Sequence, residues 1–204
     1  MCGRFYIESE DTPAELEQML EEAAGRMDEP LQKGEIGPGD TACVLAPSRQ
    51  NGSLRPFAMR WGFPLERKLV INARLETAPL RPMFRESYRI RRCLIPASGW
   101  FEWDHREKRP PKYRFHASRT PWLWLAGLYR HEPGSPPRFV VVTRPAEGDI
   151  ALLHDRMPLC FEAQDGNRWL LQESDGDFAA LGAAGIQWER QPGAPEQISM
   201  LSST

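Results

Sequence analysis

Two short apolar runs meet in the segment Arg92-Cys93-Leu94-Ile95-Pro96-Ala97-Ser98-Gly99-Trp100-Phe101-Glu102-Trp103. The first covers residues 92–96 and the second residues 99–103, with small residues between them. Runs of this length, rich in aliphatic and aromatic side chains and bounded by turn residues, are typical of buried strands. The segment therefore predicts two strands, and the second of them carries a carboxylate, Glu102.

Similar runs recur along the rest of the chain, separated by turns that contain many of its 19 Pro and 16 Gly residues. We expect further strands at 42–46, 54–61, 69–73, 112–115, 122–129, 139–143 and 186–190, and exposed hairpin loops at 106–111 and 132–137. Strands that follow one another without regular intervening helices favour an α+β fold. Its main feature would be a mixed or antiparallel sheet that curls into a barrel.

One helix is clearly predicted near the start of the chain. Thr12-Pro13-Ala14-Glu15 has the pattern of a capping box with Pro at the first helical position, and apolar residues follow at helical spacing until Gly25. Shorter helices are expected at 148–153, 168–172 and 178–183.

Length and composition favour one compact domain spanning residues 1–204, with a loosely held tail from about Gln191. No segment resembles a signal peptide or reaches the roughly 18 apolar residues of a membrane span, so we expect a soluble cytoplasmic protein, nucleoid-associated in a bacterium. The four cysteines lack zinc-ligand spacing. We expect neither a metal nor an organic cofactor.

Charge is distributed unevenly along the chain. Residues 1–47 hold 3 Lys/Arg and 11 Asp/Glu, residues 48–130 hold 18 and 6, and residues 131–204 hold 5 and 11, giving net charges of −8, +12 and −6. Arginine predominates in the basic middle part, and guanidinium groups suit bidentate contacts to phosphate. This part is either a phosphate-binding face or a solvated surface balanced by the acidic ends.

The chain begins Met1-Cys2-Gly3-Arg4-Phe5. Removal of Met1 would leave Cys2 with an α-amine, of reference pKa about 7.7–8.0, and a thiol, of reference pKa about 8.5, so both would be partly nucleophilic near neutral pH. Such an aminothiol condenses with an aldehyde to an imine and then closes a thiazolidine ring. Only a chain-terminal cysteine can do this.

Four further segments place polar residues among apolar ones: 60–63 (Arg-Trp-Gly-Phe), 71–77 (Ile-Asn-Ala-Arg-Leu-Glu-Thr), 92–103 and 154–158 (His-Asp-Arg-Met-Pro). Together with Cys2-Gly3-Arg4, in this order, they make the chain similar to the SRAP family, the SOS response-associated peptidases. The resemblance runs from residue 2 to about residue 158. It implies a pair of packed, barrel-like sheets with peripheral helices and a basic groove for single-stranded DNA, with the N-terminus at its floor.

The resemblance also implies a role for each matching residue. Cys2 would form a thiazolidine crosslink with the ring-opened sugar of an abasic site, Glu102 and His154 would transfer protons, and Asn72 would orient Cys2 and the sugar. Arg4 and Arg74 would contact phosphates, and Trp61 would stack on a base. Met1 removal by the protein itself, reversal of the crosslink and cleavage of the strand at the abasic site belong to the same expectation. Replication-associated partners are not identified by the sequence.

Each residue also has a simpler interpretation. Glu102 could face solvent on an alternating strand, His154 could be structural, Asn72 could stabilise a turn, and Trp61 could pack in the core. Two segments also depart from the family pattern: residues 61–65 lack a second stacking Trp, and residues 35–39 replace the usual Asn-x-Ala-Pro turn.

Two other functions remain compatible with the residues. The first is a thiol peptidase acting on other proteins, with Cys2 as nucleophile and His154 as base. The second is a non-covalent reader of modified DNA bases. A peptide library tests the first, and blocking the α-amine tests the second, because non-covalent binding would survive the block.

Overall fold

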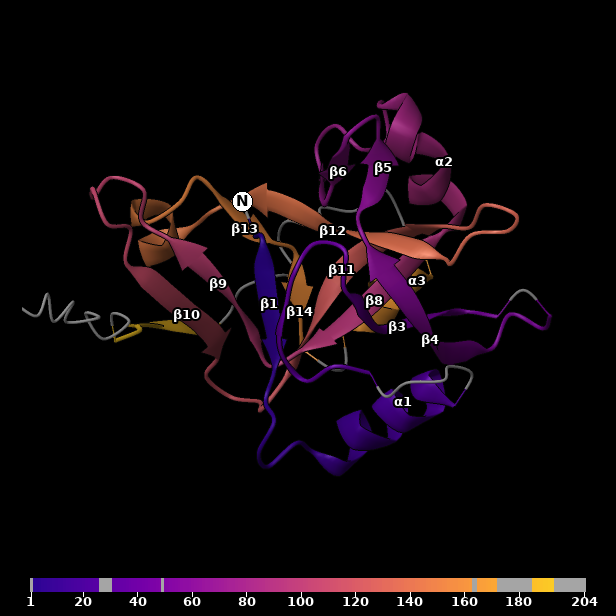
Figure 1. Ribbon diagram of the computed structural model, residues 1–204, viewed down its shortest axis with the longest axis horizontal. Helices are drawn as coiled ribbons and strands as arrows, with labels where there is room; N and C mark the ends of the chain where they lie inside the picture. The colour runs from indigo at the N-terminus through magenta and orange to yellow at the C-terminus, as the bar shows by residue number, and fades with distance from the viewer. Residues whose placement is uncertain (1, 26–30, 49, 163–164, 172–184, 193–204) are drawn as a thin grey trace, which may run out of the picture.

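Two large sheets form the body of the protein in the computed structural model (Figure 1). The structure describes residues 2–25, 31–48, 50–162, 165–171 and 185–192. The first sheet has five strands in the order β15-β10-β9-β1-β2. The strands are β1 (Arg4–Ile7), β2 (Gly34–Ile36), β9 (Gly99–Trp103), β10 (Lys112–Ala117) and β15 (Ile186–Arg190). All of its pairings are antiparallel.

The second sheet has eight strands and closes on itself, because β12 pairs with both β4 and β11. The closed path runs β12-β4-β3-β8-β11 and returns to β12. The strands are β3 (Thr41–Pro47), β4 (Leu54–Trp61), β7 (Asn72–Arg74), β8 (Arg92–Ala97), β11 (Leu123–Arg130), β12 (Arg138–Pro145), β13 (Arg156–Pro158) and β14 (Cys160–Phe161). The pairings of β12 with β4 and with β7 are parallel. The sheet is therefore mixed and barrel-like, as the sequence predicts.

The remaining elements lie at the edges of the sheets. A separate hairpin is made by β5 (Phe63–Leu65) and β6 (Lys68–Val70), and the helices are α1 (Ala14–Ala24), α2 (Pro82–Ile90), α3 (Gly166–Leu170) and the 3-10 helix η1 (Gly148–Leu152). Figure 1 shows α1 below the closed sheet and α2 beside the β5–β6 hairpin above it. The α+β class with peripheral helices is confirmed.

The predicted strands agree with the structure within a few residues, except at 69–73, which divides into β6 and β7. The sequence did not predict β1, β2, β5, β13, β14 or α2, most of which are too short to show an apolar pattern. The loops at 106–111 and 132–137 do join antiparallel strand pairs. The predicted helix at 178–183 and the tail beyond Pro192 to residue 204 lie outside the described residues.

The start of α1 differs from the prediction. Pro13 is the N-cap residue, no side chain caps the helix, and the Thr12 hydroxyl instead donates a 2.7 Å hydrogen bond to the carbonyl of Glu8. The capping box is therefore not formed, because a hydroxyl can bond an upstream carbonyl as readily as a helix N–H. The end of α1 at Gly25 is as predicted.

The break between β8 and β9 requires a glycine at position 99. A Cβ at this position would lie 1.9 Å from the main-chain oxygen of Phe115 on the neighbouring strand β10. Only glycine permits so close an approach of two backbones. The approach seats β9 between β10 and β1, and so fixes the position of Glu102.

Candidate functional site

The N-terminal segment reaches the site through β1, which the sequence did not predict. Arg4 pairs with Phe101 and Tyr6 pairs with Gly99 in the antiparallel ladder between β1 and β9. Continued toward the N-terminus, this register would place Gly3 opposite Glu102 and Cys2 opposite Trp103. The charge of Glu102 also acts on the Cys2 thiol, so segments about 100 positions apart in the chain are neighbours.

Asn72 holds the main chain of Cys2 from the other side. It begins β7, and its side-chain Nδ2 donates a 2.9 Å hydrogen bond to the carbonyl oxygen of Cys2. Its Oδ1 is buried and accepts no hydrogen bond from another described residue. The amide nitrogen of Asn72 thus positions the main chain of Cys2, and the amide oxygen is a hydrogen-bond acceptor close to Cys2.

Glu102 is buried, with 4% of its surface exposed. Burial disfavours the charged carboxylate and raises its pKa to about 7, against the opposing effect of the N-terminal amine and with a smaller contribution from the negative charge of Asp155. The simpler interpretation, a solvent-facing strand residue, is therefore wrong. A carboxyl group with this pKa can both accept and donate a proton near neutral pH.

The thiol of Cys2 is in an environment that differs from that of a thiol exposed to water. Cys2 is fully buried, and burial followed by the negative charge of Glu102 raises its pKa well above the ordinary value. Burial thus favours the protonated thiol in the chain that carries Met1, and the expectation of a partly ionised thiol after Met1 removal stays a prediction. A nearby base must take its proton before sulfur can attack.

His154 lies between η1 and β13 with about a fifth of its side chain exposed. The main-chain N–H of Arg156 donates a 2.9 Å hydrogen bond to its Nδ1, which places the ring proton on Nε2. The Asp155 carboxylate also lies 2.8 Å from Nδ1, but that carboxylate is largely exposed, so the backbone donor fixes the tautomer. Burial lowers the pKa of His154, which keeps the ring neutral.

A bidentate ion pair joins the segment of Asn72 to the segment of His154. Arg156 donates from two nitrogens to the two carboxylate oxygens of Glu76, at 2.5 and 2.9 Å. Sequence reasoning assigned neither residue a role. The only signal was their presence in the segments 71–77 and 154–158, because a pairing across 80 residues leaves no local pattern.

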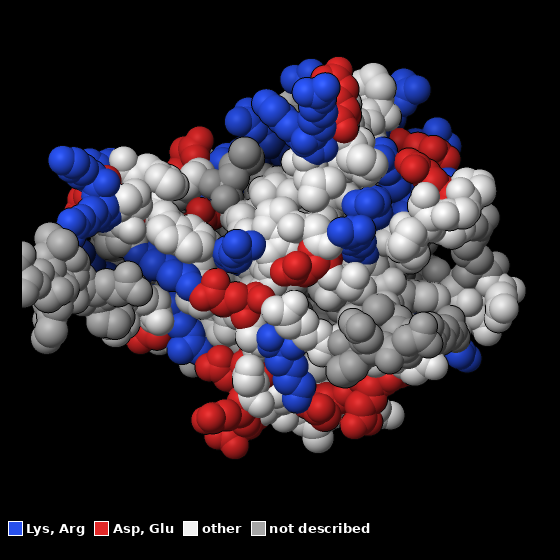
Figure 2. Space-filling model, viewed as in Figure 1, with Lys and Arg blue, Asp and Glu red and all other residues white. Residues whose placement is uncertain are grey.

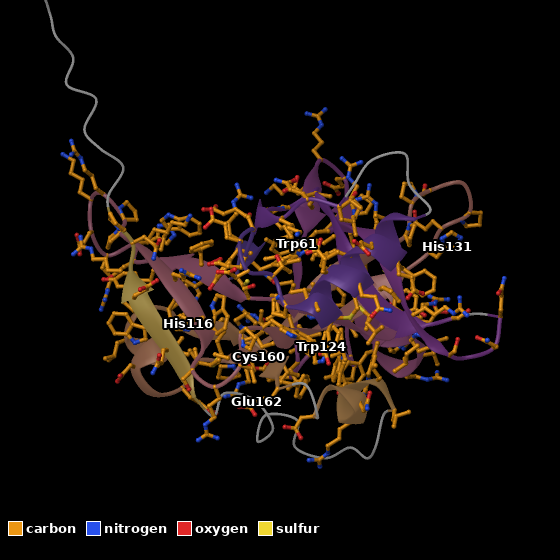
Figure 3. The ribbon with its side chains drawn as sticks, turned by 90° about the horizontal axis from the view of Figure 1, so that it is seen from below. Trp61, His116, Trp124, His131, Cys160 and Glu162 are labelled. Carbon is orange, nitrogen blue, oxygen red and sulfur yellow. The ribbon has the colours of Figure 1, made fainter. Side chains whose placement is uncertain are left out.

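Trp61 does not present a surface for a base. It is fully buried, stacks on Phe139 with ring centroids 6.1 Å apart, and donates from Nε1 to the carbonyl of Ile71 at 2.9 Å. Figure 3 shows it within the body of the fold, whereas His116 and His131 lie toward opposite ends. The stacking role predicted for Trp61 is therefore wrong in this structure, and core packing is what the side chain does.

Six basic residues of the middle part lie on or next to the β5–β6 hairpin and α2. Figure 2 shows Lys and Arg side chains over the β5–β6 hairpin and α2, at the top of the view. We call this region the basic ridge and define it by six exposed residues, none of which forms an ion pair with another described residue: Arg67, Lys68, Arg74, Arg81, Arg85 and Arg89. Arg74 connects the ridge to Asn72, two residues earlier on β7.

Arg4 begins β1, two residues after Cys2. Its side chain is half exposed, lies 4.0 Å from the Glu35 carboxylate, and packs over Gly37, where a Cβ would collide with its guanidinium. The turn at 35–39 thus provides the surface on which Arg4 rests.

No metal-binding cluster accompanies these residues. Within the described ranges, no group of three or more His, Cys, Asp or Glu side chains is arranged to hold a metal ion. The helices of the same ranges include none that is long and apolar enough to cross a lipid bilayer. The four cysteines are free thiols.

The fold and the site together define a class of protein: an α+β protein with a closed mixed sheet, in which Cys2 lies between the carboxyl group of Glu102 and the amide of Asn72. The family model described as SOS response associated peptidase (SRAP) matches residues 1–187. The chain belongs to this family.

Relatives and solved structures agree with this assignment. The chain is 31% identical to the abasic site processing protein YedK of Escherichia coli over 192 residues, covering 90% of this chain and 86% of that one. It is 29% identical to the abasic site processing protein YoqW of Bacillus subtilis, covering 87% and 84%. A solved phage-related protein from Bordetella bronchiseptica has the same fold, with a TM-score of 0.71 at 22% identity over 94% of this chain and 95% of that one.

Proposed function

We propose that this protein recognises abasic sites in single-stranded DNA and traps them through Cys2. The observation that carries the proposal is the position of Cys2, whose carbonyl is held by Asn72 and whose thiol lies within the electrostatic influence of Glu102. The names of the relatives, abasic site processing proteins, support the same substrate. An abasic sugar in its ring-opened form supplies the aldehyde that an N-terminal cysteine attacks.

The chemistry proceeds in one condensation and one addition after Met1 is removed. The α-amine of Cys2 adds to the aldehyde carbon, and one water leaves to give an imine. The sulfur of Cys2 then adds to the imine carbon, and the thiol proton ends on the nitrogen as the thiazolidine ring closes. The net change is the loss of one water molecule, and no oxidant or reductant takes part.

Glu102 and His154 serve the proton transfers. With a pKa of about 7, Glu102 is in part ionised near neutral pH and can take the proton of the buried thiol before passing it on. His154 is neutral with its proton on Nε2, which suits a hydrogen bond from Nε2–H to the sugar oxygen as the ring opens. The Oδ1 of Asn72 would accept a hydrogen bond from the sugar or from the amine of Cys2.

The basic ridge and Arg4 would hold the flanking phosphates. Phosphate contacts of this kind position a strand without reading its sequence. Reversal of the crosslink, strand cleavage and removal of Met1 by the protein itself would use the same proton-transfer groups. A cytoplasmic or nucleoid location follows from the DNA substrate.

Intact mass spectrometry tests the proposal. The purified protein should lack Met1, and incubation with single-stranded DNA containing one abasic site should give a denaturant-stable adduct with the mass of the sum minus one water. Cys2→Ala should abolish the adduct, whereas Cys43→Ala, at a buried thiol under α1, should not. Normal adduct formation by Cys2→Ala, or a terminus that keeps Met1, would end the proposal.

A further inference from the structure

Glu76 and Arg156 connect the two halves of the site across the edge of the closed sheet. Glu76 follows β7, which begins with Asn72, and Arg156 begins β13, which follows His154. Strand β12 lies between them, pairing in parallel with β7 and in antiparallel with β13. The side chain of Arg156 therefore spans one strand to reach the carboxylate of Glu76.

The position of Arg156 is tightly determined. Its side chain is 9% exposed, and in addition to Glu76 it donates a 2.7 Å hydrogen bond to the carbonyl of Thr143, which is fully buried on β12. A bidentate guanidinium–carboxylate pair fixes orientation as well as distance. The hydrogen bonds from Arg156 also lower the pKa of Glu76, so the carboxylate stays ionised.

The same residue sets the state of His154 through its main chain. The Arg156 N–H donates to Nδ1 of His154, and an imidazole that accepts at Nδ1 carries its proton on Nε2. Three other groups act on this ring: the N-terminal amine and His105 of the β9–β10 loop disfavour a positive charge on it, and the Asp155 carboxylate, 2.8 Å from Nδ1, favours a proton there. The Arg156 N–H must hold its position for the Nε2–H tautomer to prevail over the pull of Asp155.

We infer that Glu76 is a positioning residue for the reaction at Cys2: by anchoring the side chain of Arg156, it keeps the Arg156 N–H on Nδ1 of His154 and the Nε2 proton available to the sugar. The inference rests on the proposed function. Glu76 itself touches no reacting atom. It acts on His154 from one side of the sheet, while Asn72, four residues earlier, acts on Cys2.

The test compares Glu76→Gln with wild type in two measurements. Long-range ¹H–¹⁵N spectra of the imidazole report the tautomer of His154 in the free protein and need no DNA. Single-turnover crosslinking at saturating abasic DNA reports the reaction rate. Because one charge-assisted hydrogen bond is lost and the amide NH₂ opposes the guanidinium, we expect mixed or Nδ1–H tautomers and a rate lowered about tenfold, with binding to undamaged single-stranded DNA retained.

Two further variants separate positioning from simple stabilisation. Arg156→Lys keeps the charge and the main-chain N–H but loses the bidentate geometry, so it should shift the tautomer in the same direction. Glu86→Gln removes an exposed ion pair with Arg91 on α2 and is the matched control, expected to behave as wild type. Melting temperatures show that each variant is folded at the assay temperature.

Two results would overturn the inference. One is a Glu76→Gln protein with the wild-type imidazole spectrum, and the other is a rate that falls only as far as the folded fraction falls. A wild-type protein that forms no crosslink would instead refute the proposed function, and the imidazole spectra would still decide whether Glu76 positions His154.

Discussion

The side-chain Nδ2 of Asn72 donates a 2.9 Å hydrogen bond to the carbonyl oxygen of Cys2, a residue 70 positions earlier in the chain. A hydrogen bond of this kind is worth about 0.5–1.5 kcal/mol net. Here it fixes the main chain of the residue that carries the proposed nucleophile. The strand that supplies Asn72 belongs to the closed sheet, whereas the strand that follows Cys2 belongs to the other sheet.

The first prediction concerns this bond. Asn72→Ala should lower the single-turnover crosslinking rate by about tenfold, because one hydrogen bond to the Cys2 main chain and one acceptor beside it are both removed. Asn72→Asp should be at least as slow, since a carboxylate oxygen would oppose the Cys2 carbonyl. His131→Ala, far from the site, is the control. A wild-type rate for both Asn72 variants would show that the amide does not position Cys2.

Glu102 gives a prediction for stability against pH. Its folded-state pKa of about 7 lies above the ordinary value of 4.5, so the folded state binds a proton that the unfolded state releases between these values. The stability from this group is fully present below pH 4.5 and is lost as pH rises through 7. Glu102→Gln should therefore unfold like wild type at pH 4, but should be more stable than wild type at pH 8, by about 3 kcal/mol. Urea denaturation at the two pH values measures the free energy of unfolding of both proteins. A difference between variant and wild type that is the same at pH 4 and pH 8 would contradict the prediction.

Glu102 also gives a prediction for activity. The crosslinking rate of wild type should rise with pH around 7 as Glu102 ionises and becomes able to take the thiol proton. Glu102→Gln should be slow at every pH and should lack this rise. An unchanged pH profile in the variant would assign the ionisation to another group.

Trp61 distinguishes core packing from base stacking. Trp61→Ala should cost about 3–5 kcal/mol of unfolding free energy, because the ring is fully buried against Phe5 and Phe139. Trp61→Phe should fold with a smaller loss and should bind undamaged single-stranded DNA as wild type does. Weaker DNA binding by a well-folded Trp61→Phe protein would restore the stacking role.

The basic ridge predicts a salt dependence. Replacing Arg81, Arg85 and Arg89 of the ridge by Gln should weaken binding to undamaged single-stranded DNA. It should also reduce the slope of log K against log salt by about 0.7 for each phosphate that the protein no longer neutralises. The matched control neutralises three exposed arginines on other elements: Arg119, Arg168 and Arg190. Equal effects from both sets would mean that the ridge has no special role.

Local sequence accounted for much of the fold. The runs at 54–61 and 99–103 became strands with the predicted bounds, because a pleated strand buried against a core needs apolar and β-branched or aromatic residues within a short window. The strand β1 escaped prediction, since four residues after the N-terminus carry no such pattern. Its position follows from the β9 ladder, which is a pairing between distant segments.

The candidate site likewise combines features that the sequence could indicate with contacts that it could not. A cysteine directly after Met1 and a carboxyl flanked by aromatic residues at Glu102 are properties of a few adjacent residues, so the sequence alone could indicate the chemistry proposed for them. The burial of Trp61, the raised pKa of the Cys2 thiol and the ion pair between Glu76 and Arg156 depend on contacts between segments many residues apart. Solvation and hydrogen bonding are set by whatever surrounds a group in space, and only the tertiary structure decides that surrounding.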